Sequence, residues 1–368
     1  MEQKHVVHMS SVHPWDDVRI YHKEAQTVLE MGWLLTLIAR FSAANNEAPP
    51  TYVRILPEFP SRLVRVLFGP ILLFFMALKA KADVYHFHDP ELIPLGLILR
   101  ALGKNVIYDV HENVPADILT KGYLPHGFRK GLSVAAVAAE WLAGTCLTRI
   151  VCVNQEIAER FPPSKTVIIE NAPILEEGRS RCTDHANGKL KLIYTGICSQ
   201  ERGIDIMLDA IVGLECELTI AGSFRDEEFR KRLSEHAGWR QVTYLGQIPR
   251  SAVLEEMATA DAGLILFRPG LNHSGSRPNK LFEYMAAELP IIASDFGEWR
   301  KLYGDWGACF FVDPENIQQV RDAIAYLIAH RELGRERGKC GLRAVQQTYN
   351  WSLEKKKLVR CYLGIFPP

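Results

Sequence analysis

Several sequence patterns that identify a protein class directly are absent from this chain of 368 residues. Its eight cysteines are scattered without Cys-x-x-Cys spacing, which disfavours a disulfide framework or a cysteine metal site and predicts reduced, buried thiols. Forty-three basic residues balance forty-three acidic ones, so no overall field favours nucleic acid as a partner. The loop 196–203 is neither Gly-x-Gly-x-x-Gly nor a Walker loop, which removes the main support for a dinucleotide oxidoreductase or a P-loop enzyme.

Signals for membrane insertion are also weak. Residues 1–9 are too polar for a signal peptide and are predicted to form a first strand, so we expect a cytoplasmic protein. The uncharged segment 66–78 is too short to span a bilayer. Two interpretations of it stay open: a core helix, which is the simpler account of its apolar residues, or a helix lying partly on the inner face of an anionic membrane. The second interpretation depends on the flanking cations Arg62, Arg65, Lys79 and Lys81.

The composition, 48% hydrophobic and 23% charged, suits two domains of ordinary size with their own cores. Apolar runs alternate with helical periodicity from the start, beginning with strand 5–9 and helix 18–31, which indicates an α/β fold. The sequence turns polar over 176–189, and the same alternation then resumes. We therefore predict an N-terminal domain over 1–175 and a C-terminal domain over 189–352.

Polar residues follow three apolar runs of the first domain, at the carboxyl ends of strands where open α/β sheets bind ligands. The candidates at this edge are Asp16, Arg19, His88, Asp89, His111 and Glu112. The sequence supports Asp16 as a helix N-cap and Arg19 as a solvated helix residue nearly as well. Two clusters of histidine and carboxylate at one edge favour a functional site. A metal site is the weaker alternative, because no His-x-x-x-His pair or clear third ligand accompanies them.

A further helix is predicted in the second domain, where Pro278 suits the first turn, apolar residues recur at helical spacing and Pro290 closes the helix. Lys280 and Glu283 therefore lie within one turn of a helix start, where free N–H groups bind phosphate. Glu283 can accept two hydrogen bonds from a ribose diol, although on an isolated helix both residues would simply be solvated. Three other strands end at glycines, each of which could be a simple turn residue: Gly196, Gly222 and Gly246.

Together these segments resemble the retaining GT-B glycosyltransferases of glycosyltransferase family 4. The resemblance rests on the loop 194–203, on the helix 279–289 with its Glu before a Met-Ala pair, and on His-x-His-Asp-Pro (86–90) and Tyr-Asp-x-His-Glu (108–112). It implies two Rossmann-like domains facing a central cleft, with the acceptor on the first domain and the sugar nucleotide on the second. It also implies that the terminal helix, 353–368, packs back on the first domain, and that no cofactor and no metal ion are needed.

By this resemblance Glu283 holds the ribose of the donor, Arg202 holds its diphosphate, and His111 lies near the anomeric carbon. The implied donor-binding residues are Glu283, Asn279, Gly196, Ser199, Gly222 and Ile248, the implied catalytic residues are His111, Arg202 and Lys280, and the implied acceptor-binding residues are Asp16, Arg19, His88, Asp89 and Glu112. The chain departs from the family at Ile197, where an Arg that contacts the diphosphate is expected, so Lys280 or Asn279 would have to supply that contact. Gly275 replaces the first Glu of the family's pair, which leaves recognition of the donor sugar open.

The function that follows is transfer of a sugar, with retention of configuration, from a nucleotide-sugar to a glycan or polyprenyl-lipid-linked acceptor in bacterial-type surface polysaccharide synthesis. A UDP-sugar is favoured over a GDP-sugar. Two alternatives stay open: a GT-B sugar-nucleotide 2-epimerase, and a non-catalytic scaffold subunit that binds sugar nucleotide. A second basic and apolar region, 121–147, could dock a lipid-linked acceptor, although packing on the sheet is the simpler account of Val134, Val137 and Leu142.

Overall fold

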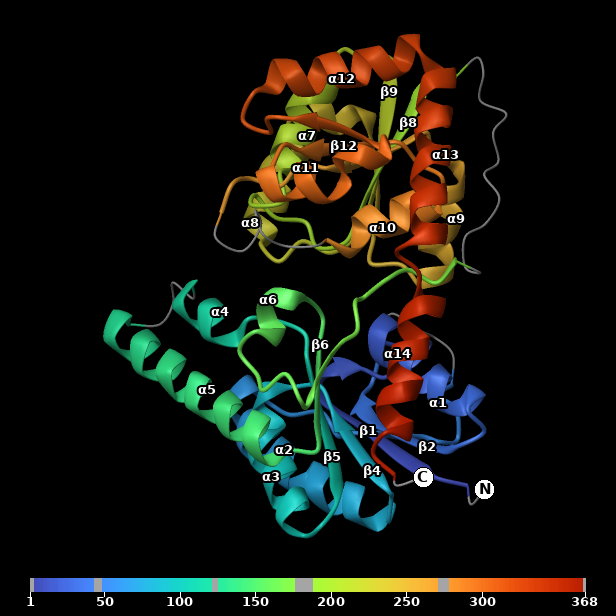
Figure 1. Ribbon diagram of the computed structural model, residues 1–368. Helices are drawn as coiled ribbons and strands as arrows, with labels where there is room; N and C mark the ends of the chain where they lie inside the picture. Colours follow the sequence, from blue (N-terminus) through green and yellow to red (C-terminus); the bar gives the residue numbers. More distant parts are fainter. Residues whose placement is uncertain (1–2, 43–47, 121–124, 176–187, 271–277, 367–368) are drawn as a thin grey trace. The chain divides into compact units, whose positions relative to one another are not determined.

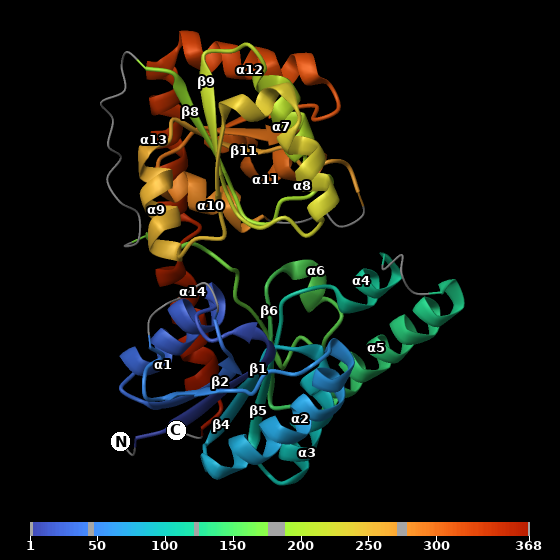
Figure 2. The same cartoon turned by 180° about the vertical axis from the view of Figure 1, so that it is seen from behind.

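The computed structural model describes residues 3–42, 48–120, 125–175, 188–270 and 278–366 (Figure 1). Contacts divide the chain into two compact units: unit 1 comprises Met1–Asn171 and Ser352–Pro368, and unit 2 comprises Ala172–Trp351. Each unit contains one parallel β-sheet with helices packed on it (Figures 1 and 2), so the predicted α/β fold with two Rossmann-like domains is confirmed. Most of the predicted polar boundary, 176–187, lies outside the described residues.

The sheet of unit 1 has seven strands in the order β3-β2-β1-β4-β5-β6-β7. The strands are β1 (His5–Pro14), β2 (Leu34–Arg40), β3 (Val53–Ile55), β4 (Val84–Phe87), β5 (Asn105–Val110), β6 (Arg149–Cys152) and β7 (Thr166–Ile168). All pairs are parallel, and β1 lies between β2 and β4, where Val7 pairs with Thr36 of β2 on one side and Tyr85 of β4 on the other. Because β1, β4 and β5 are neighbours, the polar residues that follow them meet at one edge.

The first strand and the first helix differ from the prediction. The strand predicted over 5–9 continues to Pro14, so residues expected in a loop extend the sheet edge. The helix predicted over 18–31 begins as a π-helix, Val18–Ala25, and only then becomes the α-helix α1 (Gln26–Glu30). A π-helix repeats at i to i+5, a spacing that sequence periodicity does not reveal, and it often occurs at functional sites.

The π-helix fixes a buried ion pair. Its wider turn places Arg19 and Glu24, five residues apart, on one face, with Arg19 Nε 3.0 Å from Glu24 Oε1. The N-cap is Asp17, whose Oδ1 accepts a hydrogen bond from the Arg19 backbone N–H at 2.9 Å. Asp16, the predicted alternative cap, instead accepts a hydrogen bond from Ser42 Oγ at 2.8 Å. The prediction of Asp16 as the cap is therefore wrong by one residue.

The other helices of unit 1 are α2 (Arg62–Lys79), η2 (Pro90–Leu92), α3 (Ile93–Ala101), α4 (Val114–Thr120), α5 (His126–Cys146), α6 (Gln155–Ala158) and α14 (Trp351–Leu363). From Ser352 onward, α14 belongs to unit 1 although it comes from the far end of the chain (Figure 2). The buried Tyr362 hydroxyl lies 3.0 Å from His8 Nε2 and 2.8 Å from His86 Nδ1. The last helix thus completes the core beneath β1 and β4.

Two long helices, α2 and α5, both pack on α3 and expose apolar side chains. On α2, Gly69, Leu73 and Ala77 are buried, so the core-helix interpretation holds for one face only. The prediction that Val134, Val137 and Leu142 of α5 pack on the sheet is wrong, because they are 69%, 51% and 40% exposed. We call the following residues the apolar face of α2 and α5: Leu63, Leu67, Phe68, Ile71 and Phe75 on α2, and Phe128, Leu132, Val134, Val137, Trp141 and Leu142 on α5. Among the described helices, none has the length and hydropathy needed to cross a bilayer.

Seven cysteines lie in the described part of the chain, and all are free thiols. Five are buried, as predicted, whereas Cys340 is half-buried and Cys146 is exposed at the end of α5. Cys182 lies outside the described residues. The described cysteines therefore act as small apolar side chains, mostly within the cores.

The sheet of unit 2 has six parallel strands in the order β10-β9-β8-β11-β12-β13. The strands are β8 (Leu190–Thr195), β9 (Cys216–Ala221), β10 (Val242–Gly246), β11 (Ala262–Ile265), β12 (Ile291–Ser294) and β13 (Cys309–Val312). The helices are α7 (Ile204–Ile211), α8 (Glu227–Ser234), η4 (Ala237–Gln241), α9 (Arg250–Thr259), α10 (Asn279–Ala286), α11 (Gly297–Tyr303), η5 (Gly304–Trp306), α12 (Ile317–Ala329) and α13 (Arg331–Gln347). Strand β12 ends at Ser294, and Gly297 then begins α11.

Candidate active site

Three glycines bring the strand ends of unit 2 into close contact. Gly222, directly after β9, lies so near Gly196 that a Cβ atom on it would come within 1.8 Å of the Gly196 carbonyl oxygen. Gly203 has a φ of +69°, and a Cβ atom there would lie 1.9 Å from the carbonyl oxygen of Leu266. Any other residue at Gly222 or Gly203 would displace the backbone. These glycines are thus packing requirements that hold the loop 196–203 against the sheet edge.

Two cations converge on this loop. Lys280, in the first turn of α10, is buried, with its Nζ 5.0 Å from the centre of the Tyr194 ring. The same Nζ lies beside Gly196, since a Cβ atom on that glycine would come within 2.7 Å of it. The Phe267 ring centre lies 5.7 Å from Lys280 Nζ and 5.2 Å from the Arg202 guanidinium carbon. Among the described residues, no carboxylate forms an ion pair with Lys280 or Arg202. An anion would therefore meet both cations and the glycine backbone together.

The surroundings of Lys280 also change its ionisation. Burial, and then the positive charge of Arg202, lower the pKa of Lys280 to about 7, while the Glu283 carboxylate acts in the opposite direction. The side chain is thus near its titration midpoint at neutral pH. A diphosphate bound beside it would favour the charged form and raise this pKa, so ligand binding and proton uptake are coupled here.

Glu283 lies one turn further along α10. Its Oε1 accepts a hydrogen bond from Arg250 Nη1 at 3.1 Å, which orients the carboxylate. The Glu283 side chain is 22% exposed, so it can still reach a ligand. Of the other predicted donor-binding residues, Asn279 is exposed at the start of α10, and Ser199 and Ile248 are half-buried after β8 and β10. Gly275 lies outside the described residues.

In unit 1, the centre of the polar edge is Asp109, the buried carboxylate at the end of β5. Arg19 donates two hydrogen bonds to it, Nε to Oδ2 at 2.8 Å and Nη2 to Oδ1 at 2.9 Å. His111 Nε2 lies 2.8 Å from Asp109 Oδ2, and His88 Nδ1 lies 3.3 Å from it. Burial alone would raise the pKa of Asp109, but the Arg19 charge, followed by that of His111, holds it well below its usual range. The alternative of Arg19 as a solvated helix residue is therefore wrong.

Asp89 and His13 form a second part of this edge. Asp89 Oδ2 accepts hydrogen bonds from Ser11 N at 2.6 Å and Ser10 Oγ at 2.9 Å, so it fastens the end of β1 to the β4 edge. His13, which the sequence did not single out, lies 3.2 Å from Asp17 through Nδ1 and 3.7 Å from Asp89 through Nε2. Burial lowers the pKa of His13, but Asp17, then Asp89 and Glu112, outweigh it and raise the value to about 9. The sequence did not indicate His13 because the strand was predicted to end at residue 9, whereas β1 continues to Pro14 and carries His13 to this edge.

These side chains line a pocket of about 570 Å³ that lies within unit 1. The predicted residues His88, Asp89, His111 and Glu112 are on its wall, whereas Asp16 and Arg19 are not. Arg19 instead hydrogen-bonds Asp109, which contacts His111 on the pocket wall. The wall also carries three arginines that sequence reasoning did not assign to the site: Arg40, Arg62 and Arg65. The pocket therefore combines hydrogen-bonding groups for hydroxyls with both cations and carboxylates, among them Arg65 and Glu91, whose Nε and Oε1 lie 3.5 Å apart.

Comparison with known proteins agrees with this geometry. Residues 180–343 match the family described as glycosyl transferases group 1. A phosphatidyl-myo-inositol mannosyltransferase from Mycobacterium leprae is 27% identical over 295 residues, which cover 76% of this chain and 73% of that protein. Sucrose-phosphate synthase from Thermosynechococcus elongatus has a TM-score of 0.75 at 15% identity, over 99% of each chain. The Anabaena protein HepE, in complex with UDP and glucose, has a TM-score of 0.72 at 12% identity, over 98% of this chain and 100% of that chain.

The family match falls on the unit that carries Arg202, Lys280 and Glu283, and the structural similarity extends over both units. The predicted family is thereby confirmed. Residues 180–343 form a glycosyl transferases group 1 domain, and the chain is a glycosyltransferase with the GT-B fold.

Proposed function

We propose that the protein transfers a sugar, with retention of configuration, from a nucleotide-sugar bound by unit 2 to a lipid-linked or glycan acceptor bound by unit 1. The observation that carries the proposal is the pair Arg202 and Lys280 beside the Gly196 backbone at the start of α10. A UDP-sugar is favoured over a GDP-sugar. The Anabaena structure with UDP and glucose supports that preference.

On the donor side, the residues of unit 2 act on the departing diphosphate. As the glycosidic bond breaks, negative charge grows on the phosphate oxygens, and preorganised cations stabilise it most in the transition state. Arg202 and Lys280 supply the positive charges. Lys280 replaces the diphosphate contact that an Arg at position 197 would make in the family. Glu283, oriented by Arg250, accepts the ribose hydroxyls.

On the acceptor side, His111 is held by Asp109, which is held by Arg19. This arrangement orients the imidazole at the pocket wall and favours its proton on Nε2. Arg62 and Arg65 lie on the same wall and belong to α2, whose exposed apolar row begins at Leu63. An acceptor with an anionic head group and an apolar tail could bind with its head group at the pocket wall and its tail along the apolar row of α2. The name of the Mycobacterium leprae relative, which includes a phosphatidyl-myo-inositol, agrees with such an acceptor.

A His111→Ala variant tests the division of labour. We expect turnover to fall about 100-fold, the usual size for loss of one positioned polar or proton-transferring group, while nucleoside diphosphate affinity stays within about two-fold. Initial rates with a nucleotide-sugar and a polyprenyl-phosphate-linked acceptor give the first quantity, and calorimetry with UDP gives the second. His330→Ala, at an exposed histidine of unit 2, serves as the control. Loss of UDP binding in folded His111→Ala, or product formation without any acceptor, would overturn the assignment.

The apolar face of α2 and α5 predicts reversible binding to anionic membranes. Basic residues accompany it on both helices: Arg62, Arg65, Lys79, Arg129 and Lys130. Each cation near such a surface contributes about 1 kcal/mol, which the apolar side chains supplement. Co-sedimentation with vesicles of phosphatidylglycerol should exceed that with phosphatidylcholine and fall with salt.

The paired variants Leu67→Glu and Trp141→Glu should release the protein from these vesicles, because both side chains are exposed and their replacement leaves the core intact. The matched control is Tyr326→Glu, an exposed apolar position in unit 2. Equal binding by wild type and the paired variant would remove the membrane-contact proposal and leave the donor assignment untouched.

A further inference from the structure

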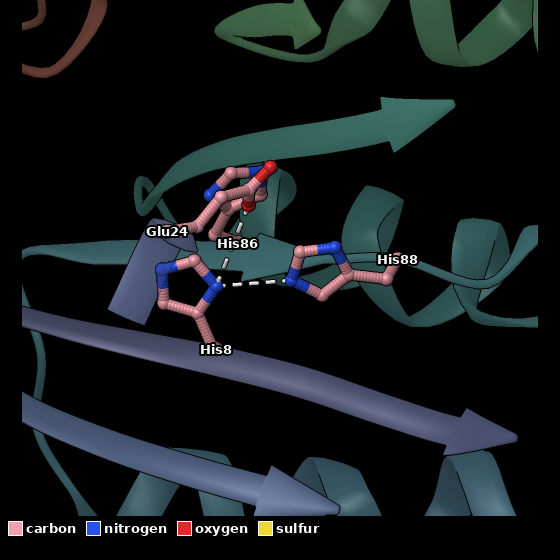
Figure 3. Close-up of side chains that lie close together, drawn as sticks. All are labelled: His8, Glu24, His86 and His88. Carbon is pink, nitrogen blue, oxygen red and sulfur yellow. Dashed lines mark hydrogen bonds and ion pairs between the residues drawn. The ribbon is translucent and has the colours of Figure 1, made fainter. Parts of the chain in front are cut away.

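Four buried side chains in unit 1 point toward one another (Figure 3). They are His8 of β1, His86 of β4, His88 just after β4, and Glu24 of the π-helix. One ligand-type atom from each lies within 4.8 Å of the other three. His8 Nδ1 is 2.9 Å from His88 Nε2 and 4.0 Å from Glu24 Oε2, and His86 Nε2 is 3.9 Å from that same oxygen.

Each histidine of the group is anchored through its other ring nitrogen. His8 Nε2 and His86 Nδ1 both lie within 3.0 Å of the Tyr362 hydroxyl, and His88 Nδ1 lies 3.3 Å from Asp109 Oδ2. Outer partners of this kind fix the ring orientation and the tautomer of metal-binding histidines, leaving the inner nitrogen with its lone pair free to coordinate. The outer contacts therefore preset the inward direction of three nitrogens.

Hydrogen bonding joins His8 Nδ1 to His88 Nε2 but does not account for the other inward atoms. His86 Nε2 and both carboxylate oxygens of Glu24 are buried without a hydrogen-bond partner. Arg19 Nε lies 3.0 Å from Glu24 Oε1, but its N–H is donated to Asp109. Hydrogen bonds link Tyr362 to His8 and His8 to His88. His86 Nε2 and the two Glu24 oxygens take no part in this series and face one another. Such an arrangement is costly unless something positively charged satisfies them.

We propose that His8, Glu24, His86 and His88 bind one divalent metal ion of the zinc type. Three imidazole nitrogens and one carboxylate oxygen form a donor set that zinc accepts in tetrahedral sites. Zinc–nitrogen bonds of about 2.0–2.1 Å would separate the ligand atoms by roughly 3.3 Å. The three separations given above run from 2.9 to 4.0 Å and all pairs lie within 4.8 Å, so the more distant side chains would have to move inward to bind the ion.

The charges around the site are compatible with a cation. Arg19 is matched by Asp109, with Nε 2.8 Å from Asp109 Oδ2, and Glu24 places a further carboxyl group 3.0 Å from the same nitrogen. Because four protein ligands complete the coordination and all are buried, the ion has no open position for substrate. Its role is structural: it ties β1, β4 and the π-helix together beneath α14. It takes no part in sugar transfer, and the inference does not depend on the proposed function.

The test is the metal content and spectrum of the full chain. Protein purified without chelator from zinc-supplemented medium should hold about one zinc ion per chain, and protein from cobalt-supplemented medium should show the strong visible absorption of tetrahedral cobalt. His86→Gln and Glu24→Gln should each lose the ion. Tyr362→Phe, which keeps all four ligands, should weaken binding by about 10–100-fold.

The matched control is His5→Gln, a half-buried histidine of the same strand that belongs to no ligand set in the described residues, and it should keep the ion. Zinc retained equally in folded His86→Gln and wild type would overturn the proposal. If the ligand variants do not fold, wild-type protein decides. Folded chain with less than about a tenth of an ion, or a weak octahedral cobalt spectrum, would show that the four groups form only a hydrogen-bonded cluster.

Discussion

Arg202→Ala is expected to lower kcat about 100-fold or more while leaving nucleoside diphosphate affinity within a few-fold. The guanidinium meets a ligand charge that increases as the glycosidic bond breaks, so its loss weighs more on the transition state than on the ground state. The Phe267 ring beside it would be undisturbed by the truncation, since it also packs in the core of unit 2. Initial rates with saturating donor, and calorimetry with UDP, separate the two quantities.

Glu283→Gln is the companion variant, with the opposite expected pattern. Its amide keeps an oxygen for Arg250 but offers the ribose diol a weaker acceptor, so UDP binding should weaken by about 1–3 kcal/mol. Lys231→Ala, which removes an exposed cation of unit 2, is the control for general charge loss. Wild-type UDP affinity in folded Glu283→Gln would remove the donor assignment. An equal loss of affinity and rate in Arg202→Ala would mean that it binds the ground state and transition state alike.

Asp109→Ala is expected to lower the free energy of unfolding by about 3–5 kcal/mol, because it leaves the buried Arg19 without its bidentate partner. Urea denaturation measures the change. Its difference from wild type should shrink as the pH falls below about 4, since the pKa of Asp109 is held low in the folded state and the carboxylate contribution is lost on protonation.

Glu30→Ala provides the matched control in the same unit. Its carboxylate pairs with Lys355 at the surface, and exposed pairs of this kind contribute about 0–1 kcal/mol. If Asp109→Ala and Glu30→Ala shift the urea midpoint equally, Arg19 does not depend on Asp109, and the proposed positioning of His111 through Asp109 fails with it.

The sequence was sufficient for the sheet and for most strands, because parallel strands buried on both faces are continuous apolar runs. The helix predicted after Pro278 likewise begins at Asn279, as α10. The beginning of the chain did not follow the pattern. Residues 10–14 are mixed in polarity and yet extend β1, and residues 18–25 adopt a π-helix that the spacing of apolar residues cannot distinguish from an α-helix.

Periodicity also failed to separate core faces from exposed apolar faces. Helix α2 is apolar on most of its surface, so its sequence does not show which row meets the sheet and which, from Leu63 to Phe75, stays outside. In α5 the same ambiguity led to the wrong prediction for Val134. An exposed apolar residue becomes recognisable only when the neighbouring element that could cover it is known.

For the site, the sequence supplied residue types but not their partners. It placed Lys280 and Arg202 on the same side of unit 2, and the structure adds the Phe267 ring they share. In unit 1, Arg19 was assigned to the acceptor, whereas it acts through Asp109, a residue ninety positions away. Pairings over such separations follow from strand order, which a single sequence leaves undetermined.

During synthesis on the ribosome, Tyr362 emerges 354 residues after its partner His8 and 276 residues after His86. Unit 2, made from one continuous stretch, can therefore finish folding while unit 1 still lacks its last helix. Over that interval the nascent N-terminal sheet has its histidines uncovered and relies on weaker, transient contacts. A helix translated after unit 2 thus determines when the sheet translated before unit 2 becomes native.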